Sequence, residues 1–124
     1  MQVTLLKSKL HRASVTAVSP DYSGSLSIDR DLMDAAGFLH HEKILVGNIT
    51  NGERFETYCI PAPSGSGEIA LNGAAAHKGK PGDLIVILSF VSLDPEEAAV
   101  WEPRLILVGS KNLSHELIPH STNQ

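Results

Sequence analysis

The stretch KILVGNITNGERFETYCI, residues 43–60, decides the fold class of this chain. Two runs of strand length, 43–49 and 54–60, flank the dipeptide Asn51-Gly52. An Asn-Gly pair between such runs is the strongest short-range signal for a β-hairpin, closed by a two-residue type I′ turn. The stretch therefore predicts an antiparallel hairpin and a fold that is mainly β.

Shorter runs of the same kind continue on both sides of this hairpin, with turn residues between them. They cover residues 3–6, 11–18, 68–71, 84–91 and 104–108. Many short strands with little helix favour a small β-barrel or a β-sandwich. A length of 124 residues suits a single domain with one core.

Two short helical segments interrupt the strands. Asp29 predicts the N-cap of a helix, and Gly37 predicts its C-terminal end. Residues 95–100 have room for one further helical turn. From about residue 110 the periodic pattern is lost, which predicts a flexible tail over 110–124.

Composition narrows the class of protein. A net charge of −4 argues against nucleic acid or an anionic membrane surface as a partner, because such partners favour basic proteins. Cys59 is the only cysteine, so no intramolecular disulfide can form and a reducing cytoplasm is expected. No signal peptide is recognisable, and the longest apolar run, 84–88, is too short for a membrane span.

Several common site motifs are missing from the sequence. None of the six histidines has a spacing that favours a metal site, and no cysteine cluster assists them. The segment Gly65-Ser66-Gly67 lacks the lysine and the following helix of a phosphate-binding loop. We therefore expect no metal and no phosphate loop.

The second strand of the hairpin carries chemically useful side chains. Strand alternation places Arg54, Glu56 and Tyr58 on one face and Thr57 on the other. Arg54 offers a fork of donors suited to a carboxylate, and Tyr58 offers a phenolic proton. Equally, Arg54 can form a surface ion pair while Tyr58 covers the core with its ring. The residue types alone leave both interpretations open.

The segment DYSGSLSID, residues 21–29, raises a second question. Tyr22, Ser23, Gly24 and Ser25 stand close together just ahead of the predicted helix. One interpretation is a turn that leads into a helix cap. The other is that the chain is cut here, so that a serine becomes the reactive group.

Five segments of the chain resemble a known family, the pyruvoyl-dependent L-aspartate α-decarboxylases of bacteria. The resemblance runs from about residue 3 to about residue 109. The segments are KSKLHRASVT (7–16), YSGSLSID (22–29), NGERFETY (51–58), NGAAAH (72–77) and PGDLIVILSF (81–90). The resemblance implies a small six-stranded double-psi β-barrel with short helices, assembled as a homotetramer with active sites between subunits.

The resemblance also implies that the precursor cleaves itself between Gly24 and Ser25. Residues 1–24 become a β chain and residues 25–124 an α chain, whose first residue is converted to a covalent pyruvoyl group. This group forms a Schiff base with L-aspartate, in the role that pyridoxal phosphate has elsewhere. The implied products are β-alanine, for pantothenate and coenzyme A biosynthesis, and carbon dioxide.

The remaining site residues are assigned by the same resemblance. Thr57 stabilises the oxyanion during cleavage and contacts substrate, Tyr58 donates the proton, and Lys9 and Arg54 hold substrate carboxylate. The other implied pocket residues are Asn72, Gly73, Ala74 and Ala75. His11 and Tyr22 lie beside these segments and either line the site or serve in packing.

Two positions depart from the family pattern. Ser23 stands where relatives often have an acidic or apolar residue, and Gly47 stands where some have a bulky aromatic. Two alternative functions stay open: decarboxylation of another small acid such as glutamate, or an unprocessed barrel that acts as a binding module. The sequence also leaves open whether maturation needs an accessory protein.

Overall fold

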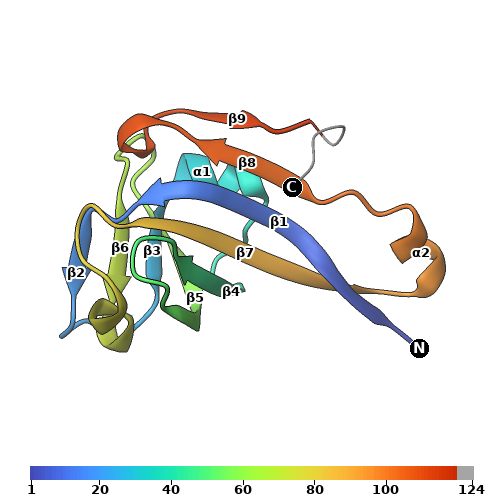
Figure 1. Cartoon of the computed structure of the whole chain (residues 1–124), viewed down its shortest axis with the longest axis horizontal. Helices are drawn as coiled ribbons and strands as arrows, with labels where there is room; N and C mark the ends of the chain where they lie inside the picture. Colours follow the sequence, from blue (N-terminus) through green and yellow to red (C-terminus); the bar gives the residue numbers. More distant parts are fainter. Residues whose placement is uncertain (120–124) are drawn as a thin grey trace.

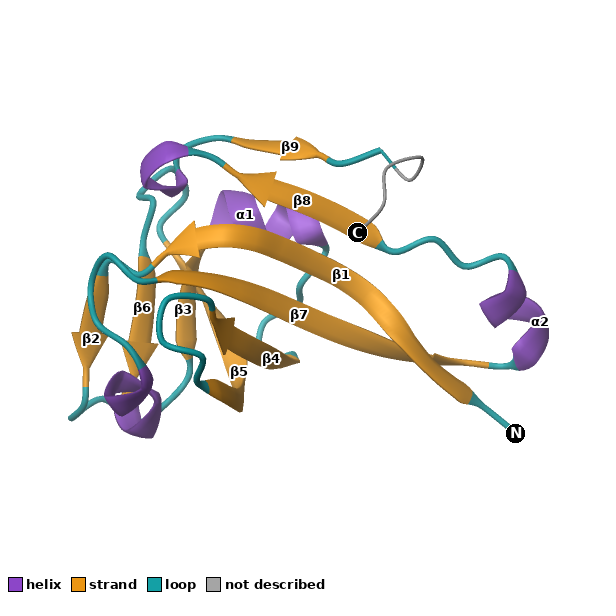
Figure 2. Cartoon of the chain, in the orientation of Figure 1, coloured by secondary structure: helices purple, strands orange, loops and turns teal. Residues whose placement is uncertain are grey.

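Strands dominate the computed structural model, which describes residues 1–119. Over these residues nine strands form one mixed sheet in the order β2-β6-β3-β5-β4-β7-β1-β8-β9 (Figures 1 and 2). The strands are β1 (Val3–Ser14), β2 (Ala17–Ser19), β3 (Leu26–Asp29), β4 (Lys43–Asn48), β5 (Arg54–Ala62), β6 (Ile69–Asn72), β7 (Leu84–Leu93), β8 (Arg104–Val108) and β9 (His115–Leu117). The helical segments are α1 (Arg30–Ala36), η1 (Gly73–Lys78), α2 (Pro95–Ala99) and η2 (Ser110–Asn112). The mainly β class predicted from the sequence is confirmed.

Strand β1 is longer than the sequence pattern indicates. It pairs antiparallel with β7 and parallel with β8, as one continuous strand rather than two separate runs. Its register against β7 shifts between Leu6 and Ser8 and again between His11 and Ala13. Each shift changes the face to which later side chains point, so simple alternation along the sequence is broken.

The predicted hairpin is confirmed as β4 and β5, but its turn is not the predicted type I′ turn. Asn48 N–H donates to Glu53 O, and Gly52 N–H donates to Asn48 O, so residues 49–52 form a four-residue connection. Type I′ needs positive φ at both central residues, and here only Gly52 has it, at 82°. The side chain of Asn48 explains the difference, because its Oδ1 accepts the N–H groups of Thr50 and Asn51.

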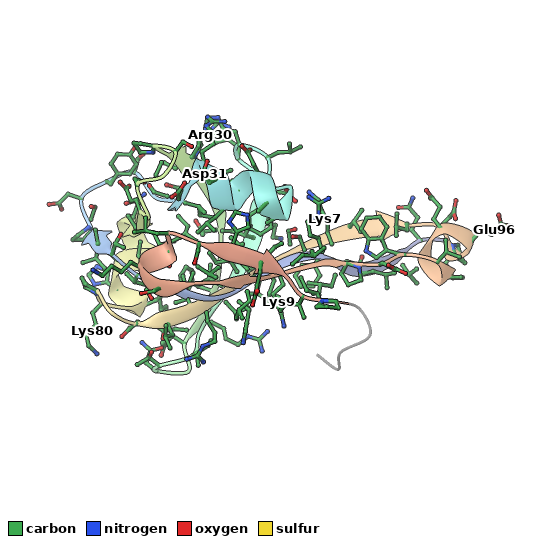
Figure 3. The ribbon with its side chains drawn as sticks, turned by 90° about the horizontal axis from the view of Figure 1, so that it is seen from above. Lys7, Lys9, Arg30, Asp31, Lys80 and Glu96 are labelled. Atoms are coloured by element: carbon green, nitrogen blue, oxygen red, sulfur yellow. The ribbon has the colours of Figure 1, made fainter. Side chains whose placement is uncertain are left out.

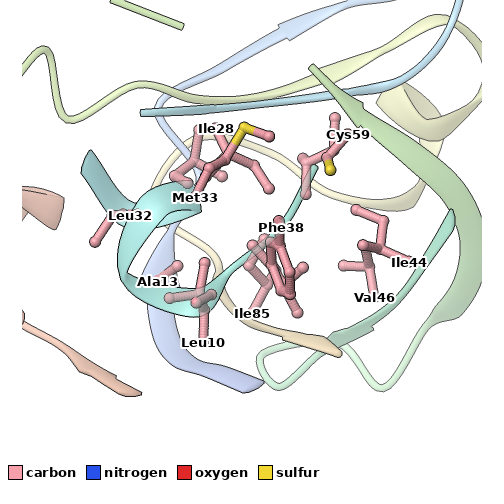
Figure 4. Close-up of a cluster of buried hydrophobic side chains, with 14 of the residues drawn as sticks. Leu10, Ala13, Ile28, Leu32, Met33, Phe38, Ile44, Val46, Cys59 and Ile85 are labelled. Atoms are coloured by element: carbon pink, nitrogen blue, oxygen red, sulfur yellow. The ribbon is translucent and has the colours of Figure 1, made fainter. Parts of the chain in front are cut away.

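The helix α1 confirms its predicted caps and closes one side of the core. Asp29 Oδ1 accepts the N–H of Asp31, and Gly37 ends the helix with φ 75°. The core side chains pack between this helix and the curved sheet (Figure 4). They include Leu10, Ala13, Ile28, Leu32, Met33, Phe38, Ile44, Val46, Cys59 and Ile85. Within residues 1–119, no helix is both long and apolar enough to cross a membrane.

The segment after residue 108 is more regular than its composition predicts. The structure has η2 and then β9, which pairs antiparallel with β8, and the flexibility of the tail over 110–124 stays a prediction. Asn112 is only 1% exposed; its Oδ1 accepts Ser14 N–H, and its Nδ2 donates to the carbonyls of Ser14 and Gly67. One asparagine thus anchors this segment to the end of β1 and to the loop before β6. Residues 120–124 of the predicted tail lie outside the described residues.

We expect Asn112→Ala to destabilise the fold. It removes three hydrogen bonds and leaves buried backbone groups of Ser14 and Gly67 without them. Such groups cost about 1–3 kcal/mol each, and alanine at the left-handed φ of 59° adds strain. The expected loss is at least about 2 kcal/mol, measured by urea denaturation at fixed protein concentration. Exposed Ser110→Ala is the control, and equal midpoints for the two variants would contradict the anchoring role.

Candidate active site

The Gly24–Ser25 pair lies in an unusual backbone conformation between β2 and β3. Ser25 is 2% exposed and has φ 92°, and Gly24 before it has φ 107°. A positive φ is open to glycine but unfavourable for serine, at a cost on the order of 1–3 kcal/mol. Strain is therefore concentrated on the peptide bond that the sequence predicts to be cut.

The first residue of η1 packs directly against this bond. A Cβ atom added to Gly73 would lie 2.7 Å from Gly24 Cα and 2.8 Å from Gly24 N. Gly73 itself has φ 66°. Only glycine allows this approach, and Figure 1 shows η1 beside the loop that joins β2 to β3. Gly73 thus forms part of the close backbone packing around the Gly24–Ser25 bond.

Asn72 fixes the position of Ser25. Its side-chain Nδ2 donates to Ser25 Oγ at 3.1 Å and to Ser27 Oγ at 2.9 Å, and its backbone N–H donates to Ser25 O at 3.0 Å. Asn72 is 4% exposed, so these bonds have little competition from water. The Ser25 hydroxyl is consequently held in place from one side.

A first pocket, of about 180 Å³, opens onto Ser25. Its lining unites residues from three parts of the chain that the sequence analysis connected. They are Gly24 and Ser25, Thr57 on β5, and Asn72, Ala74 and Ala75 around the start of η1. The alanines keep one wall small, so the pocket suits a small ligand close to the backbone.

A second pocket, of about 320 Å³, also includes Ser25. Tyr58 and Tyr22 line it, together with Ser23 and two residues that the sequence analysis did not select, His40 and His41. Thr57 and Tyr58 point to opposite faces of β5, as strand alternation predicts, so each reaches Ser25 from a different side.

The residues that are expected to bind the substrate carboxylates lie outside the two Ser25 pockets of the same chain. Over residues 1–119, Lys9, His11 and Arg54 do not line either pocket that contains Ser25. Arg54 instead lines a groove of about 400 Å³ beside Gly47, and His11 and Gly47 both pair with Val86 of β7. Lys9 lies two pairs further along, opposite Leu88. Lys7, which is labelled in Figure 3, lies on the side of β1 that faces α1, and its ammonium donates a hydrogen bond to Gly37 O.

Two other side chains, His11 and Cys59, have shifted pKa values. Burial, with Lys9 and Arg12 nearby, lowers the pKa of His11, whose Nδ1 has no hydrogen-bond partner among the described residues. Burial, with Glu42 nearby, raises the pKa of Cys59 to about 11, and its Sγ donates to Leu39 O. The thiol therefore stays protonated near neutral pH and does not act as a nucleophile. In residues 1–119 no group of three or more His, Cys, Asp or Glu side chains is arranged to hold a metal ion.

Comparison with known proteins decides the family. The family model described as aspartate decarboxylase matches residues 1–115. The chain belongs to the aspartate decarboxylase family. The aspartate 1-decarboxylase of Myxococcus xanthus is 45% identical over 124 residues, which cover 100% of this chain and 93% of that protein. Those of Acetivibrio thermocellus and Thioalkalivibrio sulfidiphilus are 52% and 53% identical, each over 90% of this chain and 89% of the relative.

Family membership confirms the assignment made from the sequence, aspartate 1-decarboxylase. Within this member of the aspartate decarboxylase family, the structure brings Ser25, Thr57, Tyr58 and Asn72 together. It does not bring Lys9 or Arg54 to them within one chain. His40 and His41 were missed because no spacing or periodicity marks them. The only feature of the sequence that sets these two histidines apart is that they follow one another directly.

Proposed function

We propose that this decarboxylase matures by cutting its own chain between Gly24 and Ser25 and then converts L-aspartate to β-alanine and carbon dioxide. The observation that carries the proposal is the Gly24–Ser25 bond itself, with positive φ on both sides and a buried serine hydroxyl held by Asn72. A strained backbone of this kind raises the ground state toward a rearrangement that relieves it.

Cleavage begins with the Ser25 hydroxyl. Its Oγ attacks the Gly24 carbonyl carbon, the peptide C–N bond breaks, the nitrogen of residue 25 takes the proton, and an ester replaces the amide. Negative charge on the Gly24 oxygen during attack needs a hydrogen-bond donor. Thr57 lines the same pocket as both residues, which supports its expected role as that donor.

Elimination then completes maturation. Loss of the α proton of residue 25 expels the Gly24 carboxylate and leaves dehydroalanine. Addition of water and loss of ammonia convert dehydroalanine to the pyruvoyl ketone. The surroundings fit a small uncharged group, because Ala74 and Ala75 form one wall and Asn72 supplies a donor at the position of Ser25 Oγ. The pyruvoyl carbonyl supplies the electron sink for decarboxylation, so neither a metal nor pyridoxal phosphate is required.

Side chains of the protein donate the proton and bind the substrate. Tyr58 lines the second pocket together with Ser25, which supports its expected role as proton donor to the former α-carbon. Asn72 and the small residues after it orient the substrate in the first pocket. Lys9 and Arg54 are expected to bind substrate carboxylate, for which their charge and donor geometry suit them.

Assembly supplies what a single chain lacks. Since Lys9 and Arg54 lie outside both Ser25 pockets, we infer that a neighbouring copy brings them to the site, in a homotetramer. We further propose that six of the strands close as a double-psi β-barrel. The parallel pairs β1–β8 and β3–β5 among antiparallel neighbours support that mixed topology. A cytoplasmic location, with β-alanine passing to pantothenate synthesis, completes the proposal.

Intact-mass spectrometry of purified protein under denaturing conditions tests the proposal. We expect two fragments, residues 1–24 and residues 25–124, the larger one lighter by one ammonia than a chain that begins with serine. The same preparation measured by light scattering without denaturant is expected at four times the mass of one processed protomer. A single uncut chain after prolonged incubation would contradict self-cleavage without an accessory protein.

We expect Gly73→Ala to slow this cleavage. The new Cβ would meet the Gly24 backbone at 2.7 Å and sit at an unfavourable φ of 66°, so the Gly24–Ser25 bond must shift. A change of about 1.4 kcal/mol in the barrier is tenfold in rate, and we expect at least about that loss. Gly82→Ala is the matched control, because Gly82 has φ 95° with no atom within 4 Å of an added Cβ. Time courses on denaturing gels compare the two, and equal cleavage would exclude a role for the close approach.

A further inference from the structure

The turn between α1 and β4 places two histidines against Tyr58. The ring centroids of His40 and His41 lie 3.9 Å apart, with planes tilted by 31°. The His41 ring meets the Tyr58 ring edge-on, at a centroid distance of 5.7 Å and an interplanar angle of 62°. All three side chains line the second pocket, which also contains Ser25.

Hydrogen bonds on both sides fix this turn. The Glu42 carboxylate accepts Leu39 N–H at 2.8 Å and the Lys7 ammonium at 2.9 Å. On the other side, His41 N–H donates to Cys59 O at 2.8 Å, directly beside Tyr58 in the chain. His41 lies in the turn before β4 and has φ 73°, a left-handed conformation. The histidine ring is therefore held at Tyr58 by the fold.

We propose that His41, backed by His40, is a positioning residue for Tyr58: it holds the phenol at the Ser25 pocket and, when protonated, makes it a stronger proton donor. Edge-to-face aromatic pairs are stabilising beyond their buried area. A positive charge beside a phenol favours the phenolate, and so favours release of the proton. The inference rests on the proposed role of Tyr58 as the donor.

Other ionisable side chains also lie around Tyr58. Lys43 pairs with Tyr58 across the β4–β5 ladder and forms an ion pair with Glu56 at 3.5 Å. Glu42 is paired with Lys7, and Tyr22 lines the same pocket as Tyr58. Lysine, glutamate and tyrosine keep one charge state between about pH 5 and pH 8, whereas histidine titrates there. The pH profile of turnover is therefore the measurement that separates a histidine contribution from those of the other side chains in this cluster.

The test is the pH profile of kcat and KM for the processed enzyme and its His41→Asn variant, with L-aspartate. Asparagine tolerates a left-handed backbone, so the turn is kept while the ring is lost. In the parent enzyme we expect a component of kcat that falls as pH rises through about 5–8. In His41→Asn we expect this component to disappear and kcat at the acid end to drop by about twofold to tenfold. KM is expected to change less than twofold, because His41 contacts Tyr58 rather than the substrate carboxylates.

Controls separate this inference from the proposed function. His115→Asn removes an exposed histidine on β9 and should leave the profile unchanged. If His41→Asn misfolds, His41→Gly provides the same test, since glycine adopts the same φ freely. A His41→Asn enzyme with the parent profile would overturn the inference, and Tyr58→Phe in the same assay would show whether the donor role still stands. Full turnover by Tyr58→Phe would overturn both.

Discussion

Ser25→Ala is expected to leave the chain uncut at 124 residues and to abolish decarboxylation. Without the hydroxyl there is no nucleophile for the Gly24 carbonyl, no ester and no elimination, so the ketone cannot form. Alanine has the same backbone preferences as serine at φ 92°, and it fills nearly the same buried volume. The variant should therefore fold, keep the strained bond and fail only in chemistry. Intact mass and release of carbon dioxide from L-aspartate measure the two effects.

Ser27→Ala is the matched control for that experiment. Ser27 Oγ receives a hydrogen bond from the same Asn72 amide, at 2.9 Å, and Ser27 is 8% exposed. It therefore shares the partner and the burial of Ser25 but not the position next to the scissile bond. We expect Ser27→Ala to cleave and to turn over aspartate. Cleavage in Ser25→Ala would show that another group attacks the chain and would remove Ser25 from its role.

The fold was predictable where one local signal had no competitor. Asp29 and Gly37 bound α1 as predicted, because capping depends on a few adjacent backbone groups. The hairpin turn was predicted wrongly because the signal of Asn51-Gly52 is overridden by Asn48, whose side chain accepts two N–H groups of the loop. Asn112 likewise orders a segment without periodicity through contacts with Ser14 and Gly67, which lie far away in sequence. Long-range polar anchors of this kind leave no local pattern.

The same distinction holds for the candidate site: residues in local motifs could be predicted, and residues placed by long-range contacts could not. Ser25, Thr57 and Asn72 were predicted through whole motifs, and they meet in one pocket. His41 could not be predicted, because its contact with Tyr58 depends on a left-handed residue and on hydrogen bonds from a neighbouring strand. The sequence likewise could not predict that Lys9 lies outside the Ser25 pockets of its own chain, because strand register sets its position.

Tyr58→Phe is expected to leave cleavage intact and to lower kcat by at least about tenfold, since a positioned proton donor contributes typically 10²–10⁴-fold. The ring stays, so its edge contact with His41 and its place on β5 are preserved, and only the proton is lost. Cleavage should proceed because its groups, Ser25 and Thr57, line the other pocket. Intact mass establishes that processing is complete, and steady-state kinetics with L-aspartate then give kcat and KM.

Tyr22→Phe sharpens this experiment, because Tyr22 carries the only other phenol in the sequence and lines the same pocket. The two variants remove one hydroxyl each from the lining of the pocket that contains Ser25. A loss of kcat confined to Tyr58→Phe would assign proton donation to Tyr58 on β5, whose position is fixed by strand pairing. A loss confined to Tyr22→Phe would assign it to the loop before the scissile bond. In that case the donor would belong to residues 1–24, the fragment that also carries Lys9.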